Sequence, residues 1–155
     1  MILAACAAIN AAHAADAANA ADGISAPHYE WHLPRGFPRP AVPLENPMSA
    51  AKVALGRRLF FETRLSSSGR YSCSSCHRPE LAFTDGRAHA LGATGEHVRR
   101  GAMSLTNVAY NPAFTWSSNQ VRSLEAQMRQ PLFNAHPVEM GLKKDGASAV
   151  AALTA

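Results

Sequence analysis

Apolar side chains recur at intervals of three and four residues in two stretches of this chain, the spacing of one face of an α-helix. The first stretch consists of Met48, Ala51, Leu55 and Leu59. Asn46-Pro47 precedes it, and a proline in the first helical position after an Asn cap is a typical helix start. We therefore predict a helix of about three turns that ends at Phe60 or Phe61.

The second stretch consists of Val121, Leu124 and Met128. We expect this helix to end before Pro131, because the residue that precedes a proline disfavours the α conformation. A third, Ala-rich helix is predicted from Ser148, and it reaches Ala155 without a capping residue, which indicates a helix that is cut short. No stretch alternates convincingly between apolar and polar residues, so the pattern predicts an all-α fold.

Proline and glycine dominate the segments between the predicted helices. Residues 25–46 contain Pro34, Pro38, Pro40 and Pro43. Since proline has no backbone N–H to donate, this segment is predicted to be an extended arm rather than a helix or a central strand. A long Gly-rich loop follows Pro79, and loops of such length in compact domains are usually functional. Its glycines are Gly86, Gly92, Gly95 and Gly101.

Cys73-Ser74-Ser75-Cys76-His77 matches C-x-x-C-H, the attachment sequence of a c-type haem. The two thiols would bind the porphyrin covalently, and His77 would be the proximal iron ligand. A zinc site would need a second pair of ligands, and no other Cys lies downstream. A redox dithiol would follow a strand in a βαβ unit, whereas the flanking residues here are Ser, Gly and Pro. We therefore expect one haem c, attached through Cys73 and Cys76.

The length and charge of the chain limit the number of haems that it can hold and the partners that it can bind. With 155 residues, the chain has room for one domain with a substantial core, and thus for one haem. Its net charge is +4, but the basic residues are scattered and are not interleaved with aromatic residues, so nucleic-acid binding is not expected. After the first two dozen residues there is no run of ~20 apolar residues, so no transmembrane span is predicted.

The first 24 residues are Ala-rich and contain no Lys or Arg. They resemble the remnant of an export signal, with Ala12-His13-Ala14 as one cleavage pattern and Leu3-Ala4-Ala5-Cys6 as a lipoprotein pattern acylated at Cys6. An Ala-rich tail is the alternative. We predict a periplasmic protein organised as a leader (1–24), the extended arm (25–46), a haem domain (47–145) and the start of a truncated helix (146–155).

Several ordered motifs between Pro47 and Leu142 resemble the N-terminal haem domain of the bacterial di-haem cytochrome c peroxidases, within them the MauG and MbnH branch. Besides C-x-x-C-H, the motifs are Leu55-Gly56-Arg57-Arg58-Leu59-Phe60-Phe61, Ala82-Phe83-Thr84-Asp85-Gly86, Met103-Ser104-Leu105-Thr106-Asn107, Tyr110-Asn111-Pro112 and Glu139-Met140-Gly141-Leu142. The resemblance implies a cytochrome c-like domain that carries the peroxide-reactive haem. It also implies a following domain with a second haem, so that this chain is the N-terminal half of a two-domain protein.

The resemblance assigns roles to individual residues. Gln127 and Glu139 correspond to a Gln and a Glu of the distal pocket, where Glu139 would move a proton of bound peroxide. Trp116 corresponds to a Trp between the two haems, which can pass an electron. The arginines that could bind haem propionates are Arg57, Arg58 and Arg100.

The sixth position of the iron is expected to be open, because the position of the family's ligating His falls near Ala93. His89 and His97 of the long loop are expected to lie at the surface. The family also binds calcium through an Asn that follows an Arg. Gly101 stands in that place after Arg100, which leaves calcium a doubtful cofactor.

Two functions remain open at this point. The first is a haem c-dependent peroxidase that reduces hydrogen peroxide, or uses it to oxidise a residue of a partner protein, with an electron-donor protein or a protein substrate as partner. The second is a mono-haem electron carrier in which a Met fills the sixth position and blocks peroxide. The methionines available for that ligation are Met103, Met128 and Met140.

Overall fold

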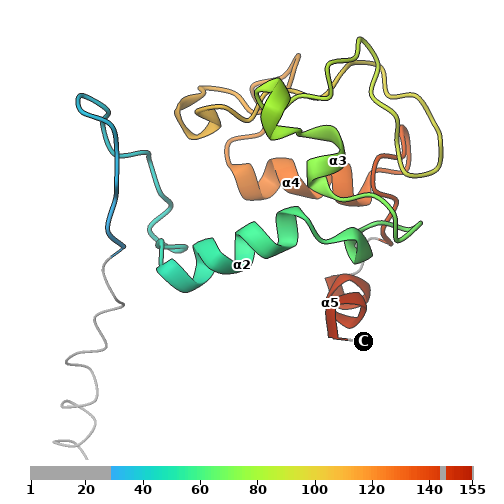
Figure 1. Cartoon of the computed structure of the whole chain (residues 1–155), viewed down its shortest axis with the longest axis horizontal. Helices are drawn as coiled ribbons and strands as arrows, with labels where there is room; N and C mark the ends of the chain where they lie inside the picture. Colours follow the sequence, from blue (N-terminus) through green and yellow to red (C-terminus); the bar gives the residue numbers. More distant parts are fainter. Residues whose placement is uncertain (1–28, 144–145, 155) are drawn as a thin grey trace, which may run out of the picture. The chain divides into compact units, whose positions relative to one another are not determined.

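The computed structural model describes residues 29–143 and 146–154, shown in Figure 1. The α-helices of this part are α2 (Ala50–Phe60), α3 (Cys73–Cys76), α4 (Leu124–Phe133) and α5 (Gly146–Thr154). Short 3-10 helices are η1 (Thr63–Leu65), η2 (Pro79–Leu81) and η3 (Val108–Tyr110). The described residues form no strand beyond isolated bridges, so the helical class is confirmed. All these elements belong to one compact unit, Leu33–Ala155.

Helix α2 begins later than its sequence pattern predicted. Its N-cap is Ser49, whose side chain accepts a hydrogen bond of 3.2 Å from the backbone N–H of Lys52. The predicted cap, Asn46, instead donates to Glu125 of α4 and accepts from the Lys52 ammonium. The prediction was wrong because serine is an equally good cap and Asn46 makes longer-range bonds. The end at Phe60 is as predicted.

Helix α4 runs through Pro131, which the sequence pattern placed after its end. A proline late in a helix has no N–H for one backbone hydrogen bond. Here, N–H groups of the chain that returns from α4 donate to carbonyls of its last turn. The N–H of Met140 donates to the Pro131 carbonyl and that of Leu142 to the Leu132 carbonyl, each at 2.9 Å. Helix α5 likewise begins at Gly146, two residues before the predicted start at Ser148.

The hydrophobic core is small and lies where α4 and the segment after it meet the chain that leads to α3. Leu65, Leu132 and Met140 are its buried members. The partly buried residues packed against them are Leu59, Tyr71, Phe133, Leu142 and Leu153. The core therefore fixes the haem-attachment segment relative to α4.

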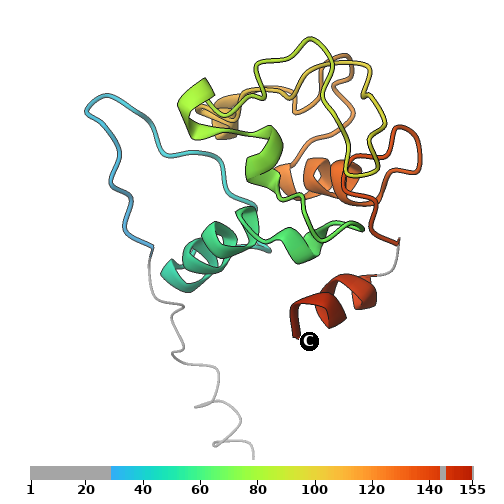
Figure 2. The ribbon, with the colours of Figure 1, turned by 45° about the vertical axis from the view of Figure 1, so that its right-hand side comes forward.

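The long Gly-rich loop is an ordered hairpin, which Figure 2 shows arching above α4. Ala90 donates to the carbonyl of Arg100 and accepts from the N–H of Val98. Nearer the tip, the N–H of Gly92 donates to the Glu96 carbonyl at 2.8 Å. We call residues 86–101 the long hairpin.

The proline-rich arm from Leu33 to Asn46 forms turns but no helix or strand. It is anchored to η3, because the Tyr110 hydroxyl donates to the Pro38 carbonyl at 2.8 Å and the Tyr110 ring packs edge-on against Phe37. The predicted leader (1–24), including Cys6, lies outside the described residues. No helix within residues 29–143 and 146–154 is long and apolar enough to cross a membrane.

Candidate haem site

The single turn of α3 places Cys73 and Cys76 on one side of the helix, three residues apart. Ser72 precedes this turn, and its backbone N–H donates to the hydroxyl of Ser75 at 3.0 Å. Ser74, the other serine between the thiols, contacts the Ser72 hydroxyl. The serines of the motif therefore stabilise a very short helix that propensity alone would not support.

Both cysteines are partly buried free thiols. Burial raises the pKa of the Cys73 thiol, and burial together with the carboxyls of Asp85 and Glu139 raises the pKa of Cys76 to about 11. A redox dithiol needs a lowered thiol pKa, which is the opposite of what this environment produces. Among the described residues there is no group of three or more His, Cys, Asp or Glu that could hold a metal ion.

The imidazole of His77 follows directly on α3 and is oriented by one hydrogen bond. Its Nδ1 atom lies 3.0 Å from the backbone carbonyl oxygen of Phe83. Because a carbonyl only accepts, Nδ1 carries the proton, and Nε2 keeps its lone pair for a metal. Such a bond to the second ring nitrogen fixes the tautomer and raises the basicity of a ligating histidine.

The turn that presents Phe83 to His77 has an unusual backbone. Ala82 and Phe83 both have positive φ angles, 54° and 59°, a conformation that non-glycine residues rarely adopt. Each such residue costs about 1–3 kcal/mol and persists only where the surroundings enforce it. The Phe83 N–H donates to the Arg78 carbonyl at 2.8 Å, and the Arg78 N–H donates to the Thr84 carbonyl, which closes the turn.

Glu139 lies in the segment that returns from α4, and its carboxyl is partly buried. Burial raises its pKa above the ordinary value of 4.5. The same carboxyl contributes to the raised pKa of the Cys76 thiol. Gln127 projects from α4, and its Oε1 atom is buried without a hydrogen-bond partner among the described residues. Both predicted distal residues therefore present a polar group away from bulk water.

The backbone around Glu139 is held by the long hairpin. The N–H of Ala93 donates to the Glu139 carbonyl at 2.6 Å, and the carboxylate of Glu96 accepts from the N–H of Val138 at 3.1 Å. Gly92 is buried so closely against this segment that a Cβ would overlap the Val138 carbonyl oxygen. Ala93 thus makes a backbone contact to the Glu139 segment.

The two histidines of the long hairpin, His89 and His97, are exposed, as the sequence predicted. Together with Arg87 they line a shallow surface pocket. The Nδ1 atom of His89 lies 3.3 Å from the Val98 carbonyl within the hairpin. This contact resembles the one at His77, but it is longer and lies on an exposed part of the hairpin.

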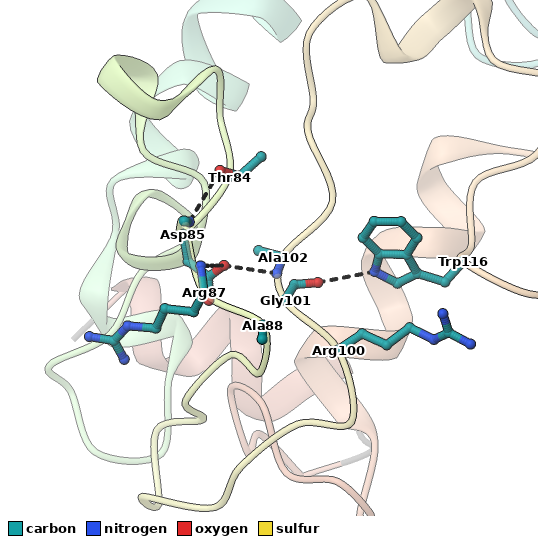
Figure 3. A pocket seen from close by; sticks show the side chains of 9 residues that line it. Thr84, Asp85, Arg87, Ala88, Arg100, Gly101, Ala102 and Trp116 are labelled. Carbon is teal, nitrogen blue, oxygen red and sulfur yellow. Dashed lines mark hydrogen bonds between the residues drawn. The ribbon is translucent and has the colours of Figure 1, made fainter.

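Trp116 lies beside a second pocket of about 380 Å³, which Figure 3 shows from close by. Its indole N–H donates to the Gly101 carbonyl at 3.0 Å, and the Arg100 guanidinium lies 6.0 Å from the ring centroid. The residue is 56% exposed. Trp116 is therefore held in a defined orientation with an accessible face. The other two predicted propionate ligands, Arg57 and Arg58, are exposed on α2.

Asp85 organises the opposite wall of this pocket. Its Oδ1 atom accepts from the N–H groups of Arg87 and Ala102, while Oδ2 is buried without a partner among the described residues. A Cβ at Gly101 would overlap the Arg87 carbonyl oxygen. Position 101 therefore has no space for a side chain.

The residues around α3 fit a covalently bound haem. The thiols of Cys73 and Cys76 are free, and Nε2 of His77 is available to iron. Several large apolar residues of the described part of the chain are exposed by a third or more, which is costly in water. Among them are Leu55, Phe61, Leu81, Trp116 and Met128.

Comparison with known proteins agrees with this fit. Residues 50–155 match the sequence profile of di-haem cytochrome c peroxidase. The chain belongs to the di-haem cytochrome c peroxidase family. Its haem c-binding sequence and its helical haem domain are thus those of this family, and the resemblance inferred from the motifs is confirmed.

The relatives of the chain include proteins named MauG and proteins named cytochrome-c peroxidase. The chain is 40% identical over 112 residues to the methylamine utilization protein MauG of Methylorubrum extorquens, a match that covers 72% of the chain and 30% of that protein. It is 44% identical over 91 residues to the cytochrome-c peroxidase IdrP1 of Denitromonas iodatirespirans, which covers 59% of the chain and 24% of the relative.

A solved structure shows a similar fold. The crystal structure of a MauG-like protein associated with microbial copper homeostasis superposes with a TM-score of 0.74 at 44% identity. The match covers 81% of this chain and 35% of that one. The chain therefore spans about a third of the length of the proteins that it resembles.

Sequence reasoning left three contacts of this site without a role: the Phe83 carbonyl on His77, the Glu96 carboxylate on Val138, and the buried carboxyl of Asp85. Asp85 and Phe83 lie inside a family motif, so their position in the sequence was itself a signal. Glu96 carries no such mark, because its partner lies 42 residues away.

Proposed function

We propose that the protein is a haem c-dependent oxidoreductase that activates hydrogen peroxide, either reducing it or using it to oxidise a residue of a partner protein. The observation that carries this proposal is the combination of an oriented His77 with a partly buried carboxyl of raised pKa, Glu139, whose charge also raises the pKa of Cys76. Haem c, when bound through Cys73 and Cys76, supplies the iron at which the O–O bond of peroxide is cleaved.

Each side chain of the site has a distinct task in this proposal. His77 donates electron density through Nε2, strengthened by the hydrogen bond from Nδ1 to Phe83. The carboxyl of Glu139 takes a proton from one peroxide oxygen and returns it to the other, and burial brings its pKa closer to neutrality, where proton transfer is most effective. Gln127 offers its buried Oε1 as an acceptor that orients the peroxide hydrogen.

Trp116 carries electrons in the same proposal. Its indole is fixed by the bond to Gly101 and has an exposed face, which supports a path toward a group outside this domain. That the chain spans about a third of its relatives' length supports a second haem domain in the whole protein. We propose that this domain, or an electron-donor protein or protein substrate docked to it, exchanges electrons through Trp116.

The alternative, an electron carrier with a Met sixth ligand, has little support. The side chain of Met140 is in the hydrophobic core with Leu65 and Leu132. Met128 is 53% exposed on α4. Calcium is given no ligand at position 101, because a glycine stands there and a Cβ would overlap the Arg87 carbonyl oxygen.

The absorption spectrum of the haem-loaded ferric protein separates the two functions. We expect a high-spin spectrum and consumption of added hydrogen peroxide at a rate proportional to protein concentration. A Met-to-iron charge-transfer band, with no reaction on peroxide addition, would establish the electron carrier instead. The same preparation, made with Cys73→Ala, should keep one thioether bond, which the pyridine adduct spectrum measures.

We further propose that the protein works in the periplasm, since haem c is attached outside the bacterial cytoplasm and the first 24 residues resemble an export signal. Fractionation of cells that produce the whole protein tests this. Recovery in the osmotic-shock fluid supports a cleaved signal, whereas recovery with membranes, abolished by Cys6→Ala, supports the lipid anchor. Retention in the cytoplasm without haem would overturn the proposal.

A further inference from the structure

Two hydroxyl groups, far along the chain, bind the strained turn that holds the proximal histidine. The Ala82 carbonyl accepts a hydrogen bond of 2.6 Å from the Ser104 hydroxyl and one of 3.2 Å from the Thr106 hydroxyl. These residues lie 22 and 24 positions after Ala82. They are part of the Met103–Asn107 motif, to which the proposed peroxide chemistry gives no task.

The hydrogen bonds from Ser104 and Thr106 fall on the turn whose next carbonyl orients His77. Ala82 and Phe83 are consecutive non-glycine residues with positive φ, a conformation that relaxes unless it is enforced. The peptide unit between them carries the Ala82 carbonyl, on which both hydroxyls converge, and the next carbonyl, that of Phe83, bonds to Nδ1 of His77. Rotation of the turn would therefore remove the acceptor from the imidazole.

The two donors are themselves held in place. The Ser104 hydroxyl also accepts from the N–H of Thr106 at 3.2 Å, so the pair forms one local unit. Asn107 then adopts a positive φ of 54° and is the N-cap of η3. The turn is therefore bound at two successive carbonyls: Ser104 and Thr106 donate to that of Ala82, and the His77 imidazole donates to that of Phe83.

We propose that Ser104 and Thr106 are positioning residues for the proximal ligand: they hold the Ala82–Phe83 turn so that the Phe83 carbonyl stays on His77 Nδ1 and sustains the electron donation of the imidazole. This inference rests on the proposed ligation of haem iron by His77. It does not require Glu139 or peroxide. Partners of this kind around metal ligands typically change affinity or activity by about 10–100-fold when removed.

The test measures the iron–histidine bond directly in the reduced, haem-loaded protein. We expect Ser104→Ala and Thr106→Val each to lower the iron–histidine stretching frequency in resonance Raman spectra and to raise the reduction potential, with larger shifts in the double variant. Loss of the peroxide rate should follow, by about 10-fold in the double variant. Ser104→Thr keeps a hydroxyl and should restore the wild-type frequency.

Ser49→Ala is the matched control, because it removes a serine hydroxyl that caps α2 and has no link to His77. It should lower thermal stability without moving the stretching frequency or the potential. Wild-type frequency and potential in both single variants would overturn the proposal; the single variants decide it even if the double variant does not load haem. Absence of an iron–histidine band in the wild-type protein would instead contradict the ligation by His77.

Discussion

Replacing Glu139 by Gln should lower kcat/KM for hydrogen peroxide by about 10²- to 10⁴-fold, the range that a positioned acid–base group contributes. Gln keeps the size and a polar end but cannot take a proton. The ferric spectrum and the haem content should stay those of the wild type, because the attachment residues are untouched. Stopped-flow measurement of the reaction with peroxide gives the rate.

The pH dependence follows from burial, which raises the pKa of Glu139 above 4.5. As a base, the carboxyl works only when ionised, so activity should rise with pH through this raised pKa and the limb should lie above the range of an ordinary glutamate. The limb should disappear in Glu139→Gln. A profile in the Gln variant that still shows this limb would assign it to another group.

The free energy of unfolding should change with pH in the direction opposite to the activity: it should fall as pH rises through the raised pKa of Glu139. A carboxyl whose folded pKa is raised favours the folded state while it is protonated, at pH values below its unfolded pKa, and loses that contribution as pH rises through the folded pKa. At neutral pH, Glu139→Gln should therefore be at least as stable as the wild type. A loss of activity without a loss of stability then reports on chemistry. Glu125→Gln, an exposed carboxyl on α4, is the control and should keep the wild-type rate.

The parts of this fold that the sequence predicted are those set by neighbouring residues. C-x-x-C-H specifies both attachment atoms and the ligand within five positions, and the structure keeps them on one turn. The end of α2 at Phe60 follows from local periodicity in the same way. The family motifs also gave Gln127, Glu139 and Trp116, although their roles stay predictions.

The errors arose where distant residues compete for the same groups. Asn46 has the right chemistry for a cap but bonds to Glu125, 79 residues away. Pro131 was predicted to lie beyond the end of α4, but the helix continues through it. The N–H of Met140, on the returning chain, donates to the Pro131 carbonyl. The hold of Glu96 on Val138 depends on the hairpin geometry, which no local pattern reveals. The periodicity of apolar residues reflects only near neighbours in the sequence, so it could not predict these contacts between distant residues.

Replacing Gly92 by Ala should destabilise the haem-loaded protein by about 3 kcal/mol, or about 10 °C in Tm for a domain of this size. The new Cβ would overlap the Val138 carbonyl oxygen and crowd the Glu139 backbone. Backbone atoms cannot rotate away as a side-chain tip can, so the hairpin must separate from the Glu139 segment. Thermal unfolding followed by circular dichroism measures the loss.

Alanine substitutions at two other glycines distinguish a general loss of stability from a displacement of the Glu139 segment. Gly56→Ala lies in α2 with nothing within 4 Å of its Cβ and should raise stability by about 1 kcal/mol, as Ala does in a helix. Gly101→Ala meets the Arg87 carbonyl instead and should lower Tm as Gly92→Ala does. Only Gly92→Ala displaces the segment of Glu139, so it should reduce the peroxide rate more than Gly101→Ala at a temperature where both are folded. Equal rates in the two variants would show that the long hairpin does not position Glu139.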